Sequence, residues 1–130
     1  MSAEECFIKV RKFHCKLIAG LASKLDSIPE GNGTMLDNTV IVYLSDSADN
    51  HHSGLKNWPV VLIGGGKSSK IKAGGTYFNY PEYGDKSHRT LASLYRTLLF
   101  SAGKAYKHFG DTDPMLKDIK QNELLHDLIS

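Results

Sequence analysis

Two aspartates and two histidines lie within seven residues near the middle of the chain: Asp46, Asp49, His51 and His52. Carboxylate oxygen and imidazole nitrogen suit a divalent metal, and a loop can bend ligands that are close in sequence around one ion. Asp46, His51 and His52 are therefore the candidate metal ligands, for zinc, manganese or calcium. Polar loops also carry these residue types without a metal, so a merely polar loop is the alternative.

Apolar runs flank this loop on both sides. Residues 39–44 and 59–63 are β-branched and apolar without alternation. Such runs are typical of strands that are covered on both faces, as in a parallel sheet under helices. Loops at the carboxyl ends of these strands are where α/β folds place their sites. The segment that contains Asp46, His51 and His52 is in that position.

The remaining elements follow from periodicity and turn residues. Apolar side chains at three- and four-residue intervals predict a helix over 4–26 with one buried face, which would include His14 as a packed core histidine. A hairpin is expected over about 70–80, a helix over about 88–102 and a short helix in the C-terminal tail. The predicted architecture is one α/β domain over 1–130, with a small, mostly parallel sheet and flanking helices.

Two further features resemble functional motifs without meeting their requirements. The segment from Gly64 to Ser68 follows a strand and contains Gly-Lys-Ser, as a phosphate-binding loop does. However, Val61 stands where that motif needs its first glycine, and no helix follows. His88 is a candidate third metal ligand, but its predicted place in the first turn of a helix favours an exposed residue. We therefore expect a turn at the glycines and no ligand at His88.

Composition narrows the class of protein. The 130 residues carry a net charge of only +2 with scattered basic residues, which gives no reason to expect nucleic acid or an anionic membrane as a partner. The longest apolar stretch, 58–66, is too short to span a bilayer. Glu4 and Glu5 stand where a secretion signal would carry basic residues. Cys6 and Cys15 are too far apart on one helix for a disulfide, so two free thiols are expected.

Longer segments of the sequence resemble a known superfamily. Residues 36–46 begin with Leu36, Asp37 and Asn38, continue through the apolar run and end on Ser45 and Asp46, and residues 58–66 run from Trp58 and Pro59 to three glycines. Together they resemble the carboxyl-terminal half of the alkaline phosphatase and sulfatase superfamily, in which such a strand ends at a metal-binding aspartate. Order and spacing from Phe13 to Leu128 are similar to an exported bacterial family named for its HxxSHH motif.

The resemblance implies that Asp46 is a metal ligand and that His51 or His52 lies near the superfamily's following histidine position. The HxxSHH motif and the half with the nucleophile are not in this sequence. The implied function is a carboxyl-terminal domain that is not catalytic alone and binds a metal or an anion through the 46–52 loop. The alternatives are a metal-dependent phosphate or sulfate ester hydrolase completed by oligomerisation, and a non-catalytic binding or structural module.

An open sheet edge would need a cover. The expected partner is therefore a second copy, or the missing amino-terminal half of a larger protein. Localisation stays open, because the resembled family is exported whereas no signal peptide is seen in this sequence.

Overall fold

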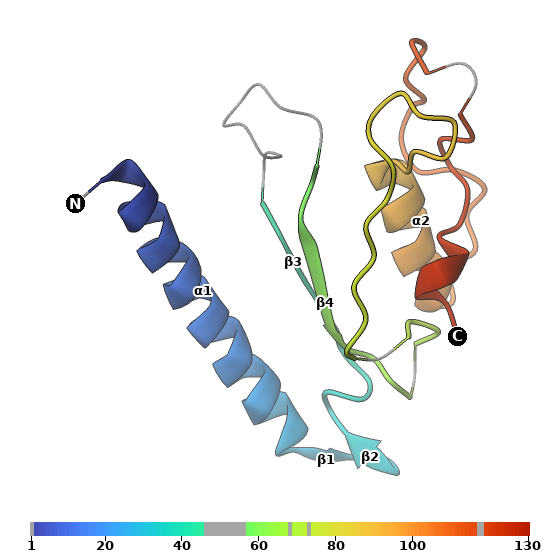
Figure 1. Cartoon of the computed structure of the whole chain (residues 1–130). Helices are drawn as coiled ribbons and strands as arrows, with labels where there is room; N and C mark the ends of the chain where they lie inside the picture. The colour runs from blue at the N-terminus through green and yellow to red at the C-terminus, as the bar shows by residue number, and fades with distance from the viewer. Residues whose placement is uncertain (1, 46–56, 68, 73, 117–118) are drawn as a thin grey trace.

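The computed structural model of the chain describes residues 2–45, 57–67, 69–72, 74–116 and 119–130. Figure 1 shows helix α1 on one side of the paired strands β3 and β4, with helix α2 and the segments that follow it on the other side. The elements in chain order are α1 (Ala3–Asp26), β1 (Pro29–Glu30), β2 (Gly33–Thr34), β3 (Val40–Leu44), β4 (Val60–Gly64), α2 (Leu91–Ser101) and a 3-10 turn, η1 (His126–Leu128).

The strands of the described residues pair antiparallel. In the larger pair, Val40 of β3 lies opposite Gly64 of β4, and Leu44 lies opposite Val60. Strands β1 and β2 form a separate antiparallel pair. The prediction of a mostly parallel sheet, resembling the carboxyl-terminal half of an alkaline phosphatase-like fold, is therefore wrong. Parallel neighbours need a crossover, usually a helix, and the residues between β3 and β4 have no helical periodicity. The apolar runs indicated strands, but they did not specify strand direction.

Helix α1 begins with a capping box. Ser2 Oγ accepts from the backbone N–H of Glu5 at 3.1 Å, and Glu5 Oε2 accepts from the N–H of Ser2 at 2.7 Å. The expectation of one buried helix face is wrong, because no residue of α1 is buried. Ile18 and Leu25 are only half-buried. His14 is exposed as well, and its ring meets Tyr43 of β3 edge-on, with 6.4 Å between ring centroids.

Helix α2 lies in the buried part of the molecule. Thr90 caps its start by accepting from the N–H of Ser93 at 3.1 Å. Its buried side chains contact the C-terminal tail, where Leu125 N–H donates to Thr97 Oγ1 at 2.9 Å. Leu94 of α2 is buried together with Ile71 and Leu125, which are 4% and 3% exposed. The buried residues of the helix itself are Ser93, Leu94, Thr97 and Ser101.

The segment between β4 and α2 differs from the expected hairpin. Among the described residues of 70–80 no strand pair occurs, and Ile71 instead forms an isolated antiparallel bridge with Ile129 of the tail. Cys6 and Cys15 are exposed free thiols. Neither α1 nor α2 combines the length and the hydropathy needed to cross a membrane, and the other described residues contain no such helix.

Candidate interaction surface

The loop that carries the candidate metal ligands joins β3 to β4. Asp46, His51 and His52 lie outside the described residues, so the metal-site prediction stays a prediction. The two ends of the loop are described. Trp58 Nε1 donates to the Ser45 carbonyl at 2.9 Å, which ties the two ends together just beyond the strand pair.

The Asp37 carboxylate organises the connection between β2 and β3. Its Oδ2 accepts from the backbone N–H of Thr34 at 2.9 Å and lies 3.3 Å from Lys67 Nζ. Lys67 also donates to the Asn32 carbonyl at 3.1 Å. The N–H of Thr34 lowers the pKa of the Asp37 carboxyl, and Lys67 adds to that shift. Asp37, which belongs to the motif that carried the family resemblance, therefore has a structural role here.

The glycines at the end of β4 contact the same turn between β2 and β3. Gly65 N–H donates to the Leu36 carbonyl at 2.9 Å. Gly64 has a φ of +84°, and a Cβ there would lie 2.3 Å from the Thr39 carbonyl, so a larger residue would displace backbone. Because Lys67 pairs with Asp37, this segment connects β4 to the turn between β2 and β3. The expected turn at the glycines agrees with that role.

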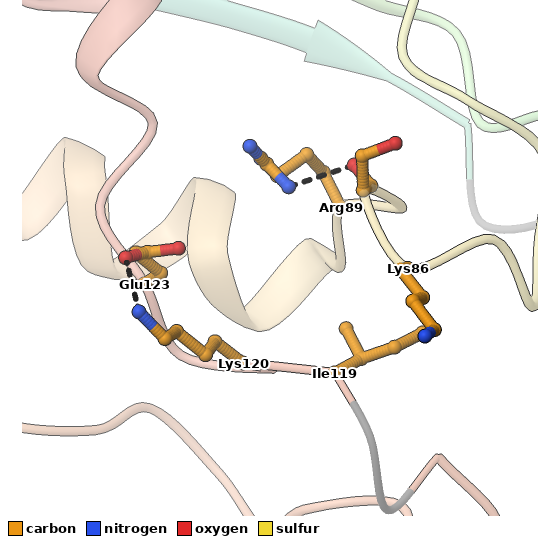
Figure 2. Close-up of a pocket in the computed structure, with 6 residues that line it drawn as sticks. Lys86, Arg89, Ile119, Lys120 and Glu123 are labelled. Atoms are coloured by element: carbon orange, nitrogen blue, oxygen red, sulfur yellow. Dashed lines mark hydrogen bonds and ion pairs between the residues drawn. The ribbon is translucent and has the colours of Figure 1, made fainter.

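A cavity of about 290 Å³ lies beside the start of α2 and is the strongest candidate for an anion site. Figure 2 shows that the side chains of Lys86 and Arg89 point apart. Arg89 donates to the Ser87 carbonyl at 2.7 Å, and Lys120 lies 3.4 Å from the Glu123 carboxylate. Two of the three cations are thus engaged within the chain, and the lining side chains do not converge on one ligand. The lining residues are Lys86, Ser87, Arg89, Ile119, Lys120 and Glu123.

His88 lies before α2 and not in its first turn. Its ring is half-buried and meets Tyr83 edge-on, with 5.3 Å between ring centroids, so the expectation of an exposed helical histidine is wrong. Within the described ranges no three His, Cys, Asp or Glu side chains form a group that could hold a metal ion.

The largest unused feature of the described chain is the apolar side of α1. Five large side chains recur at three- or four-residue intervals along it, so they form one stripe over about four turns of helix. We call these residues the α1 stripe: Phe7, Val10, Phe13, Leu17 and Leu21, which are 60%, 46%, 58%, 56% and 48% exposed. Scattered apolar residues are normal on a surface, but a continuous row marks an interaction site.

Three lysines of α1 lie on a different side of the helix from most of the stripe. At about 100° per residue, Lys9, Lys12 and Lys16 lie about 80–160° around the axis from Val10 and Leu17, whereas Phe13 at the edge of the stripe lies closer to Lys9 and Lys16. The helix therefore has a polar side for water and an apolar side for another surface. Sequence reasoning found the stripe but assigned it to the core. Only the structure shows that nothing in the described chain covers it.

The accessible area of the whole chain, including the residues outside the described ranges, is large for its mass. A folded monomer of 14.4 kDa is expected to expose about 6800 Å². This chain exposes 9412 Å², which leaves about 2600 Å² more surface in water than its mass requires. An excess of that size is larger than one side of a standard protein interface, about 800 Å² per partner.

Comparison of the chain with protein-family models, with curated proteins and with solved structures gives no match. The candidate surface therefore rests on the residues and geometry of this chain alone.

Proposed function

We propose that this chain is a binding module that associates with another polypeptide surface through the α1 stripe. The observation that carries the proposal is the exposure of about half of each large side chain in the stripe. Full burial of one such side chain contributes roughly 1.5–3 kcal/mol, so covering the exposed half of it contributes about half as much. Five of them on one straight helix therefore provide a substantial driving force for association.

The contact between α1 and the rest of the chain supports the same function. His14 meets Tyr43 edge-on, and Ile18 and Leu25 are half-buried, so one edge of the helix is already used. The stripe lies beside that edge. A partner that covers Val10 and Leu17 would contact the helix without displacing it from β3.

A dye that binds exposed apolar surface tests the proposal without knowledge of the partner. At low micromolar concentration, 8-anilinonaphthalene-1-sulfonate should bind the chain, and the double variant Phe13→Ser with Leu17→Ser should lose most of that fluorescence. Lys12→Ser, on the polar side of the same helix, is the matched control and should leave the signal unchanged. Equal fluorescence from all three proteins would overturn the proposal.

The loop between β3 and β4 supplies a separate test of the hydrolase alternative. Protein purified without a histidine tag should be analysed for bound zinc, manganese, iron and calcium and assayed with chromogenic phosphate and sulfate esters. The metal-site prediction expects about one equivalent of metal, lost in Asp46→Ala, because a missing carboxylate ligand weakens the site. Metal-free wild-type protein contradicts the metal site. Ester hydrolysis that Asp46→Ala abolishes would favour the hydrolase over the binding module.

A further inference from the structure

We infer that the partner of the α1 stripe is the α1 stripe of a second copy of this chain, with the two helices antiparallel. The inference rests on the proposed function and names its partner. It starts from the spacing of the stripe, which suits pairing of two helices better than docking on a flat surface.

The stripe follows the heptad spacing of a coiled-coil seam. Phe7, His14 and Leu21 are seven residues apart, and Val10 and Leu17 fall three residues after the first two of them. These are the a and d positions of a heptad. Phe13 lies beside the seam at a g position. Apolar residues at four of these positions favour a partner helix, because this spacing keeps one narrow side of α1 against it.

Three of the four lysines of α1 lie outside the contact of such a pair. In the same heptad, Lys9 and Lys16 take c positions and Lys12 takes an f position, which are the outermost places in a two-helix assembly. Two copies can therefore meet along the seam without bringing these like charges together. An acidic protein or an anionic membrane would instead need the lysines at the contact.

Charge at the two ends of α1 favours the antiparallel arrangement. Lys24 occupies the last d position, and Glu4 and Glu5 lie in the first turn. In an antiparallel pair, Lys24 lies at the end of the assembly that carries the partner's Glu4 and Glu5, whereas a parallel pair would place Lys24 beside the partner's Lys24. Val10 would then oppose the partner's Leu21, while His14, whose ring contacts Tyr43 of its own chain, would lie at the inner edge of the seam.

The stripe extends along most of a long helix. Helix α1 is about 36 Å long at 1.5 Å per residue, and the five stripe residues are 46–60% exposed. A standard interface removes about 800 Å² from each partner. Pairing through α1 therefore uses surface that the isolated chain leaves in water.

Sedimentation equilibrium of the full chain between about 1 and 200 µM tests the inference. The wild-type protein should change from monomer to dimer over this range, and Leu17→Asp should stay monomeric, because the charge would lie in the seam. Lys12→Asp adds the same carboxylate at an outer position and should leave the dissociation constant within about twofold. Circular dichroism at 1 µM checks that both variants fold like the wild type, as expected for residues on an unburied helix.

The outcomes separate the inference from the proposed function. A chain that stays monomeric to 200 µM overturns the second-copy inference, while loss of dye binding in the Phe13→Ser and Leu17→Ser protein would still support a different polypeptide partner. Dimerisation that Lys12→Asp abolishes and Leu17→Asp does not would place the contact on the polar side of α1 and overturn the inference too. Association only with vesicles of anionic phospholipid would identify a membrane surface instead.

Spin labels on the native Cys6, in a Cys15→Ser background, test the orientation. Antiparallel pairing in this register separates the two labelled residues by about 28 Å along the helix axis, whereas parallel pairing places them within about 15 Å of each other. Pulsed electron paramagnetic resonance measures both ranges. A distribution centred on the shorter distance would overturn the antiparallel arrangement.

Discussion

The two helices of this protein differ in how much of each is buried by the rest of the chain. Helix α1 has 24 residues and none of them is buried, although its apolar side carries Phe, Val and Leu. Helix α2 has 11 residues and buries four, of which three have hydroxyl side chains. The shorter helix with the more polar contact surface is therefore the one that the chain holds in place.

The difference shows where each helix finds its partners. In α2, Thr97 Oγ1 donates to the Ser93 carbonyl at 2.7 Å and accepts from Leu125 N–H, and Ser93 Oγ donates to the Gln121 carbonyl at 3.0 Å. The hydroxyls of Ser93 and Thr97 thus pair with the C-terminal tail of the same chain. The apolar residues of α1 have no such cover in the described chain. A surface of that kind is completed by association, which is the physical basis of the proposed function.

The largest expected effect comes from truncating the same side chain in both helices. Leu94→Ala should destabilise the chain by about 2–5 kcal/mol, because Leu94 is 6% exposed and its removal leaves a cavity. Leu17→Ala should change stability by less than about 0.5 kcal/mol at 1 µM, because Leu17 is 56% exposed. Urea unfolding at that concentration measures both. Similar losses from the two variants would break the comparison.

A smaller effect is expected from Thr97, which tests whether hydroxyl pairing holds α2. Thr97→Val keeps the shape of the side chain but leaves Leu125 N–H without its partner, which costs about 1–3 kcal/mol. Thr97→Ser keeps the hydroxyl and is the matched control for the polar contact. If Val is tolerated better than Ser in urea unfolding, packing and not hydrogen bonding fixes the helix.

Much of the local structure could be predicted from sequence, because it depends on local signals. Apolar periodicity placed the first helix, and the apolar runs placed β3 and β4. Strand direction could not be predicted, since antiparallel and parallel pairs accept the same apolar run. Burial of the α1 stripe was wrongly predicted for a related reason: periodicity shows which side of a helix needs a cover but does not show whether the same chain provides it.

The candidate sites likewise depend on contacts between residues that are far apart in sequence, which no short pattern predicts. The Asp37 and Lys67 pair joins residues that are thirty positions apart, and no short motif indicates such a contact. Hydrogen bonds from α2 to Gln121 and Leu125 are equally remote in sequence. Sequence reasoning read the glycines near Lys67 as a turn and missed their close approach to Leu36 and Thr39. Asp46, His51 and His52 stay predicted ligands on grounds of residue type.

Removal of the α1 cap should have a local effect only. Ser2→Ala deletes the acceptor for the N–H of Glu5, which weakens the helix start by about 1 kcal/mol. Since no residue of α1 is buried, hydrogen exchange at the amides of Ile8 to Val10 should become about fivefold faster in the monomer, with no change at Leu94 to Leu98. Equal acceleration in both helices would show that α1 and α2 unfold together, contrary to the comparison.

The smallest effect concerns Asp37. Its carboxylate holds the turn between β2 and β3, which is part of the chain between the two helices. Because the pKa of Asp37 is lowered in the folded chain, its stabilising contribution is present above its unfolded pKa, near 3.8, and is lost as pH falls through the folded pKa. Asp37→Asn should therefore be less stable than the wild type at pH 6, and the difference should shrink toward pH 2.

The Lys67→Met variant identifies the cause of that pH dependence. Thr34 N–H lowers the pKa of Asp37 more than Lys67 does, and the ion pair is partly exposed, so its contribution is small. Lys67→Met should accordingly retain most of the pH dependence that Asp37→Asn removes. Urea unfolding at pH 6, 4 and 2 measures it for all three proteins. If Lys67→Met removes the dependence as fully as Asp37→Asn, the ion pair and not the backbone N–H stabilises the carboxylate. The turn between β2 and β3 would then be held mainly by the segment after β4.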